Sequence, residues 1–131
     1  MALLNFKQGV SFKPSFGGMI ILQAIKTCSR LMSIDFTITS GNDGIHFDGD
    51  EGFRKLNIAN PSDPHYSGDA YDVRSHDLDP VTKQQFLANL NNLLSREQFY
   101  YYLESPNTPN EHFHIQVKKG TQFTVNNFLT A

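Results

Sequence analysis

The stretches His65-Tyr-Ser-Gly-Asp-Ala-Tyr-Asp72 and Glu111-His-Phe-His114 decide how this chain is interpreted. Together they supply imidazoles and carboxylates, which are the side chains that zinc binds at catalytic sites. Such a site has three protein ligands from His and Asp or Glu, and it leaves one position open for water. We therefore predict that His65, Asp72 and His114 bind Zn²⁺. Glu111 is predicted to be the general base that accepts a proton from the water.

The second stretch continues into a segment that alternates as a β-strand does, over residues 112–118. Alternation places polar side chains on one face and apolar side chains on the other: His112, His114 and Gln116 against Phe113, Ile115 and Val117. The apolar face is expected to pack on the core, so the imidazoles face a cleft or solvent. A regular strand would turn Glu111 toward the core. The predicted role of Glu111 as a base therefore requires it to lie at the N-terminal end of the strand, before the regular alternation begins.

The first stretch has small residues between its two predicted ligands. Gly68 and Ala70 allow the backbone to turn closely, so that His65 and Asp72 can point at one metal ion. A single His and Asp in a loop is more often a solvated polar pair, and a His-x-His strand is often accidental. The prediction therefore depends on the combination of the two stretches.

The rest of the chain predicts a single α+β domain over residues 1–131, with a small antiparallel sheet flanked by two main helices. Apolar residues at three- and four-residue spacing predict helices, and alternation predicts strands. The predicted helices are 17–32 and 81–96, and the predicted strands are 34–40, 69–74, 99–103 and 112–118. Residues 42–64 predict a long loop with a short turn or helix near 52–56, and residues 123–129 predict a weak final strand or helix.

Composition limits the classes of partner. The net charge is −2 and there is no basic block, so we expect no nucleic-acid binding. The single cysteine, Cys28, excludes an intramolecular disulfide framework and is predicted to be a core residue. The apolar run that begins at Met19 is too short for stable membrane insertion. No signal pattern occurs at the N-terminus, so we expect synthesis in the cytoplasm without a signal peptide.

The two stretches also carry a family resemblance. His65-x-x-Gly68-x-Ala70-x-Asp72, with Glu111-x-x-His114 downstream, resembles the paired signature of the zinc D-Ala-D-Ala carboxypeptidase family. That family includes the L-alanyl-D-glutamate endopeptidases of phage endolysins and shares its fold with the hedgehog signalling domain. A longer match, from Ile38-Thr-Ser-Gly41 through Asp43-Gly-x-His46 to Arg74, resembles a phage and metagenomic branch of the family. The order of elements agrees from about Pro14 to Val117, so the resemblance implies the hedgehog-type fold.

The resemblance implies a zinc metallopeptidase that hydrolyses a peptide bond involving a D-amino acid in bacterial peptidoglycan stem peptides. It would be a D,D-carboxypeptidase or an L-alanyl-D-glutamate endopeptidase in phage-associated cell-wall lysis, acting after release or as part of a phage particle. The resemblance also implies that His65, Asp72 and His114 are the zinc ligands and that Glu111 is the general base. It also implies that His112 assists near the metal, and that His46 lies at the cleft edge, where it contacts substrate or the developing oxyanion.

The chain departs from the family pattern at three places. Between His46 and His65 it carries more residues than the compact phage version. Asp63 stands where a Ser is common, and Asn42 and Asp43 follow the Thr-Ser-Gly turn where many members have an Arg. Arg74 or Arg54 can replace that Arg.

Arg74 follows Asp72 by two residues, so both side chains project to the same side of a strand. Arg74 can hold the Asp72 carboxylate, or it can bind a substrate carboxylate with its bidentate guanidinium. A solvated surface Arg is the alternative.

Two other functions stay open. One is a non-catalytic zinc-binding module of the same fold in a virion, which the missing Arg and the long loop favour. Glu111 argues against it, because a structural site needs no base. The other is a metal-dependent amide hydrolase with a substrate outside the cell wall. Two His and one carboxylate also suit other divalent metals, including iron.

Overall fold

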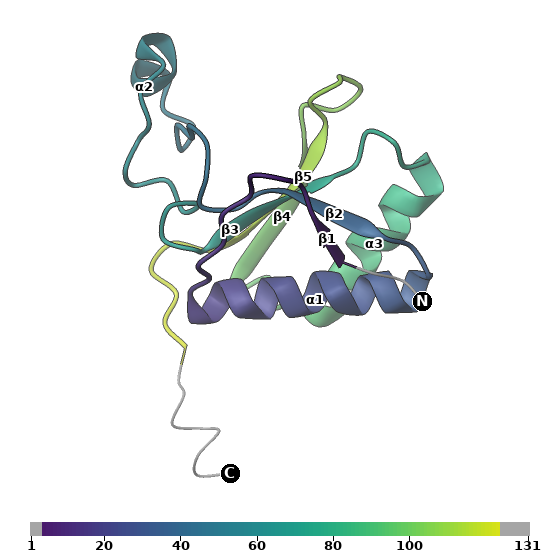
Figure 1. The fold of residues 1–131 in the computed structure, drawn as a ribbon. Coiled ribbons are helices and arrows are strands. Elements are labelled where there is room, and N and C mark those ends of the chain that lie inside the picture. The colour runs from purple at the N-terminus through teal and green to yellow at the C-terminus, as the bar shows by residue number, and fades with distance from the viewer. Residues whose placement is uncertain (1–3, 124–131) are drawn as a thin grey trace.

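A five-stranded mixed sheet forms the centre of an α+β fold in the computed structural model, which describes residues 4–123 (Figure 1). The elements in chain order are β1 (Leu4–Phe6), α1 (Phe16–Met32), β2 (Phe36–Ser40), α2 (Glu51–Leu56), β3 (Ala70–Arg74), α3 (Pro80–Leu93), β4 (Phe99–Glu104) and β5 (His112–Val117). The strand order in the sheet is β1-β2-β3-β5-β4.

The α+β class and the two main helices are confirmed, but the predicted all-antiparallel sheet is wrong. β1 pairs with β2 in parallel, whereas all other neighbouring strands are antiparallel. Parallel neighbours require a long crossover connection, and α1 provides it. With three residues, β1 is too short to show alternation in the sequence, so the pattern did not predict it.

The first helix forms where it was predicted. Ser15 caps its N-terminus, since the side-chain oxygen accepts a backbone hydrogen bond, and Ser33 ends it with a φ of 53°. The predicted apolar stripe is buried against the sheet at Ile21, Ile25 and Cys28. Cys28 is therefore confirmed as a core residue, and burial raises the pKa of its thiol to about 11.

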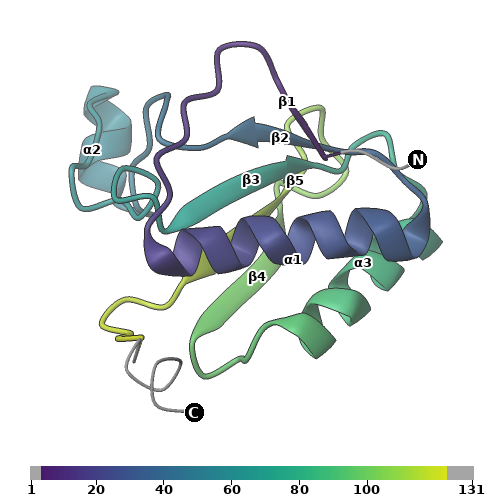
Figure 2. The ribbon, with the colours of Figure 1, turned by 60° about the horizontal axis from the view of Figure 1, so that its bottom comes forward.

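Both main helices cover the same face of the sheet (Figure 2). Phe86 of α3 packs between two sheet residues, with ring centroids 4.7 Å from Phe36 and 4.6 Å from Phe113. The predicted core side chains of β5 are buried on this face. The opposite face, which we call the open face, carries the polar side chains of β3, β4 and β5.

The second main helix is shorter at its C-terminus than predicted. Asp79 caps its N-terminus and Pro80 occupies the first turn, a position that suits proline. At the other end Leu94 adopts an extended backbone and turns into the core. The apolar spacing of this helix predicts Phe86, Leu90, Leu93 and Leu94 on its buried side. That prediction is wrong for Leu93, because the helix ends there and the side chain is 39% exposed.

The predicted long loop contains the short helix α2 and returns to β3 through close backbone contacts. Gly68 has a φ of +79°, and a Cβ there would lie 2.3 Å from the carbonyl oxygen of Lys13. A Cβ on Gly18 would lie 2.0 Å from the carbonyl oxygen of Gly68. Ser15 N donates a hydrogen bond to that same oxygen, at 3.2 Å. The start of α1 thus fixes the segment that carries His65.

None of the helices between residues 4 and 123 is both long enough and apolar enough for a membrane span. The predicted final strand or helix, 123–129, lies outside the described residues except for Phe123.

Candidate metal centre

Strand pairing brings polar side chains of three strands into rows across the open face. Side chains directly opposite each other on antiparallel strands have Cβ atoms about 4.5–5.5 Å apart. One row is Asp72 of β3, His114 of β5 and Tyr102 of β4, and the next is Arg74, His112 and Glu104. The shift in register between β2 and β3 near Ser40 lies beside the first row. Residues far apart in the sequence therefore meet above the centre of the sheet.

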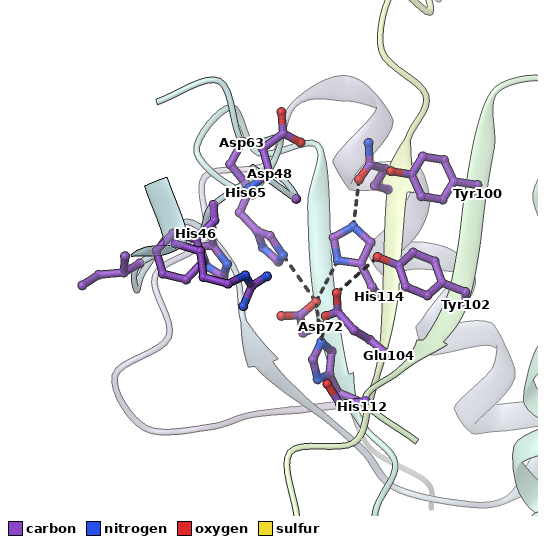
Figure 3. Close-up of a pocket in the computed structure, with 16 residues that line it drawn as sticks. His46, Asp48, Asp63, His65, Asp72, Tyr100, Tyr102, Glu104, His112 and His114 are labelled. Atoms are coloured by element: carbon purple, nitrogen blue, oxygen red, sulfur yellow. Dashed lines mark hydrogen bonds and ion pairs between the residues drawn. The ribbon is translucent and has the colours of Figure 1, made fainter. Parts of the chain in front are cut away.

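His65, Asp72 and His114 lie together, as predicted (Figure 3). Asp72 Oδ1 is 3.3 Å from His65 Nε2 and 3.1 Å from His114 Nδ1. One ligand atom from each residue lies within 4.8 Å of the other two. All three residues are buried, with exposed fractions of 2%, 8% and 8%. This group could hold a metal ion.

The far nitrogen of each imidazole is fixed by an oxygen acceptor. His65 Nδ1 lies 2.9 Å from the carbonyl oxygen of Gly41, and His114 Nε2 lies 2.8 Å from Gln116 Oε1. Each of these oxygens accepts a hydrogen bond, so the nitrogen that it contacts carries the ring hydrogen. The other nitrogen of each ring therefore points at Asp72. Metal-binding histidines are held in this way, with the second N–H on a carbonyl or carboxylate.

The electrostatics of the group favour a cation. Burial raises the pKa of Asp72, but hydrogen bonds from His114 and His65 lower it well below its usual range overall. Burial is the largest single effect and lowers the pKa of His114, but the hydrogen bond to Asp72, the charge of Asp72 and the contact with Gln116 together raise it overall. Two imidazole lone pairs and a carboxylate that point at one place repel each other unless a proton or a metal ion lies between them. The donor set fits a divalent metal.

His46 lies in the same cluster and supports His65. The two rings stack with centroids 3.9 Å apart and an interplanar angle of 9°. His46 Nε2 lies 2.7 Å from the carbonyl oxygen of Asp43 and 3.1 Å from Ser40 Oγ. Burial, followed by the charge of His65, lowers the pKa of His46. His46 also lines the large cavity described below, and its contact with substrate stays a prediction.

His46, Asp63 and His65 form a second group with metal-ligand spacing. Both carboxylate oxygens of Asp63 already accept backbone hydrogen bonds, at 2.9 Å from His65 N and 2.7 Å from Asp48 N. Asp63 therefore stabilises the loop and is not left free to bind a metal through either oxygen.

His112 pairs with a residue that the sequence did not single out, Glu104. His112 Nε2 lies 2.5 Å from Glu104 Oε2 and 3.7 Å from Asp72 Oδ1. Burial lowers the pKa of His112, but Glu104 and Asp72 raise it overall to about 9. The close contact with His112 lowers the pKa of Glu104. Alternation with Tyr100 and Tyr102 could have placed Glu104 on a polar face, but only the strand register places it beside the histidines.

Glu111, the predicted general base, is not brought to this cluster. Its carboxylate is 2.5 Å from Lys83 Nζ of α3, and it accepts hydrogen bonds from Ser75 Oγ and Asn107 N at 2.9 Å each. The residue is 4% exposed. β5 begins at His112 and continues regularly, so position 111 keeps the inward direction of Phe113. The geometry gives Glu111 a structural ion pair on the helix side of the sheet.

This ion pair leads to a prediction about acid stability. The hydrogen bond from Lys83, followed by that from Asn107, lowers the pKa of Glu111 from an ordinary 4.5 to about 2. Because the folded state holds the lower pKa, the contribution of Glu111 is complete above pH 4.5 and is lost as the pH falls toward 2. At pH 7, Glu111→Gln should lower the free energy of unfolding by about 3 kcal/mol, since Lys83 loses its partner.

Urea unfolding of wild type and Glu111→Gln between pH 7 and pH 2.5 checks this prediction. The difference between the two proteins should shrink as the pH falls. Lys83→Met should cost a similar amount, and the double variant should cost less than the sum. A difference that does not change with pH would contradict the assignment.

Arg74 is not in contact with the Asp72 carboxylate. It lines a separate cavity of about 320 Å³ on the open face, together with Thr39 and His112. The predicted alternative in which Arg74 holds Asp72 is therefore not what the structure shows.

The metal-ligand group opens into a larger cavity of about 660 Å³, which we call the main cavity. Its wall combines the histidines with Glu104, Tyr100 and Tyr102, and Arg54 of α2 also lines it. Arg54 lies over the ring of Phe47, with its guanidinium carbon 5.0 Å from the ring centroid. Pockets of this volume are typical of small-molecule and cofactor sites. Comparison with protein-family models, curated proteins and solved structures found no match for this chain.

Proposed function

We propose that this chain is a zinc-dependent peptidase of the hedgehog type that hydrolyses a peptide bond involving a D-amino acid in bacterial peptidoglycan stem peptides. The observation that carries the proposal is a buried set of two His and one Asp, with oriented rings, that opens into the main cavity. The motif resemblance supports the substrate class, the hedgehog-type fold and the link to phage lysis.

The chain's own residues would hold the metal at His65 Nε2, Asp72 Oδ1 and His114 Nδ1. Gly41 and Gln116 would keep the rings in place through the outer nitrogens. A bound divalent metal supplies Lewis acidity toward a carbonyl oxygen and toward water.

Proton transfer is assigned to Glu104 instead of Glu111. Glu104 lines the main cavity, its side chain is 43% exposed, and it lies in the row next to Asp72. Its Oε2 can accept a proton from water and return it to the leaving amine. His112 holds that carboxylate through Nε2, and its Nδ1 lies 2.7 Å from the carbonyl oxygen of Asn110, so its proposed role is to position Glu104. Glu111 is not assigned this role, because its carboxylate is buried in the ion pair with Lys83.

Metal removal tests the proposal. The protein, purified without chelator, should contain one zinc ion per chain and should clear a suspension of purified sacculi with release of new amines. Treatment with a chelator should abolish clearing, and one equivalent of zinc should restore it. Failure of the protein to bind zinc, iron or any other divalent metal on titration would exclude the site itself.

A non-catalytic metal-binding module remains the second candidate, since the position of Glu111 removes the sequence argument against it. Bound zinc without hydrolysis of sacculi would favour this module. Hydrolysis of simple amides but not of sacculi would favour the amide hydrolase with another substrate.

A further inference from the structure

A second cavity, which we call the Arg74 cavity, lies next to the main cavity on the open face. Its volume is about 320 Å³, and His112 lines both cavities. Its wall combines the end of the first strand, the middle sheet strands and the turn before β5. The lining residues with charged or polar side chains are Lys7, Thr39, Arg74, His76, Asn110, Glu111 and His112.

The charge of this cavity is positive. Arg74 and Lys7 are the basic residues of its wall besides the histidines, and within residues 4–123 neither side chain makes an ion pair or a hydrogen bond. Glu111, the acidic residue of the wall, is already held by Lys83, Ser75 and Asn107 N. It therefore does not neutralise Arg74.

Arg74 is well suited to bind an anion here. The residue is half-buried on a rigid strand, opposite His112 in the register. Its guanidinium offers five N–H donors in a planar arrangement that matches both oxygens of a carboxylate. A half-buried guanidinium without an acceptor is costly, so a ligand carboxylate would be bound favourably.

The positions of Asp72 and Arg74 on β3 set the separation between the main cavity and the Arg74 cavity. Arg74 follows Asp72 by two residues on β3, and two strand residues span about 7 Å. An extended peptide also rises about 3.3–3.6 Å per residue. A carboxylate held at Arg74 would therefore lie about two residues from a peptide bond held beside Asp72.

We propose that the Arg74 cavity is a subsite that binds a carboxylate of the substrate, with Arg74 as its principal ligand and Lys7 as a second cation. This inference rests on the proposed function for the identity of the ligand, which would be an acidic peptide. It makes Arg74 a determinant of specificity and not a part of the proton-transfer apparatus.

The first test measures binding alone, so that it holds even if the chain hydrolyses nothing. Acetate is titrated into the full chain, and the backbone amide NMR signals of His76 and Asn110 are followed. These signals should shift and saturate in wild type and in the control Arg30→Gln, which changes an exposed Arg of α1. Arg74→Gln should weaken acetate binding about tenfold or more. Equal binding by Arg74→Gln and wild type would overturn the inference.

The second test uses two substrate peptides that differ only in a carboxylate and its amide. In wild type the acid should have the lower KM. Arg74→Gln should raise the KM of the acid about tenfold, with kcat unchanged, and should leave the amide unaffected. A fall in kcat for both peptides would instead give Arg74 an oxyanion role. If Arg74→Gln does not fold, Lys7→Gln, at an exposed position, should produce a smaller shift of the same kind, and no shift would refute the subsite.

Discussion

Glu104→Gln is expected to lower kcat for peptide hydrolysis by about 100- to 10,000-fold, the usual contribution of a general acid–base residue. Gln keeps the size of the side chain but cannot accept a proton at Oε2. Glu104 is not among the three proposed metal ligands, so the metal content of the variant should equal that of wild type. Its side chain is 43% exposed, so the fold should tolerate the change. Steady-state kinetics and metal analysis of the same preparation check both expectations.

Two matched substitutions separate this role from its alternatives. Glu97→Gln changes an exposed Glu outside the main cavity and should leave the rate unchanged. Glu111→Gln should lower the stability but not the rate per folded molecule. If Glu111→Gln were the variant that lost kcat while it remained folded, the assignment from the sequence would be right and that of Glu104 would be wrong.

Asp72→Asn is expected to remove stoichiometric metal binding and, with it, all hydrolysis above background. Asp72 is the only anion in the three-residue group, and its Oδ1 lies within 3.3 Å of both other ligand atoms. Removal of a residue that hydrogen-bonds a metal ligand lowers metal affinity about 10- to 100-fold. Loss of an anionic ligand should therefore cost more than about 100-fold. Metal analysis after dialysis, followed by zinc titration with a competing chelator, measures this loss.

Asp77→Asn is the matched control for that experiment. Asp77 is an exposed residue in the turn after β3, so the same chemical change there should leave metal affinity and activity as in wild type. Circular dichroism of Asp72→Asn must show the wild-type fold. A folded Asp72→Asn protein that still retained one tightly bound zinc would contradict the metal centre.

Local periodicity was sufficient to predict most elements of the fold. The stripe of α1 and the alternation of β5 depend only on 3.6- and 2-residue repeats of side-chain direction, and both are found in the structure. Alternation also placed His112 and His114 together on the polar face. Elements without a repeat were missed or misjudged, as with the three-residue β1 and with the end of α3 at Leu93.

The sequence by itself determined which side chains can bind a metal, because residue type fixes the donor atoms and the spacing of His65 and Asp72 is short. Which carboxylate lies beside that group was decided by the tertiary structure. The pairing of β4 with β5 brings Glu104 to His112, and the packing of α3 draws Glu111 to Lys83. The pairing of β3 with β5 likewise puts Arg74 in its own cavity. Strand register and helix packing depend on contacts between distant segments, and no local pattern in the chain encodes them.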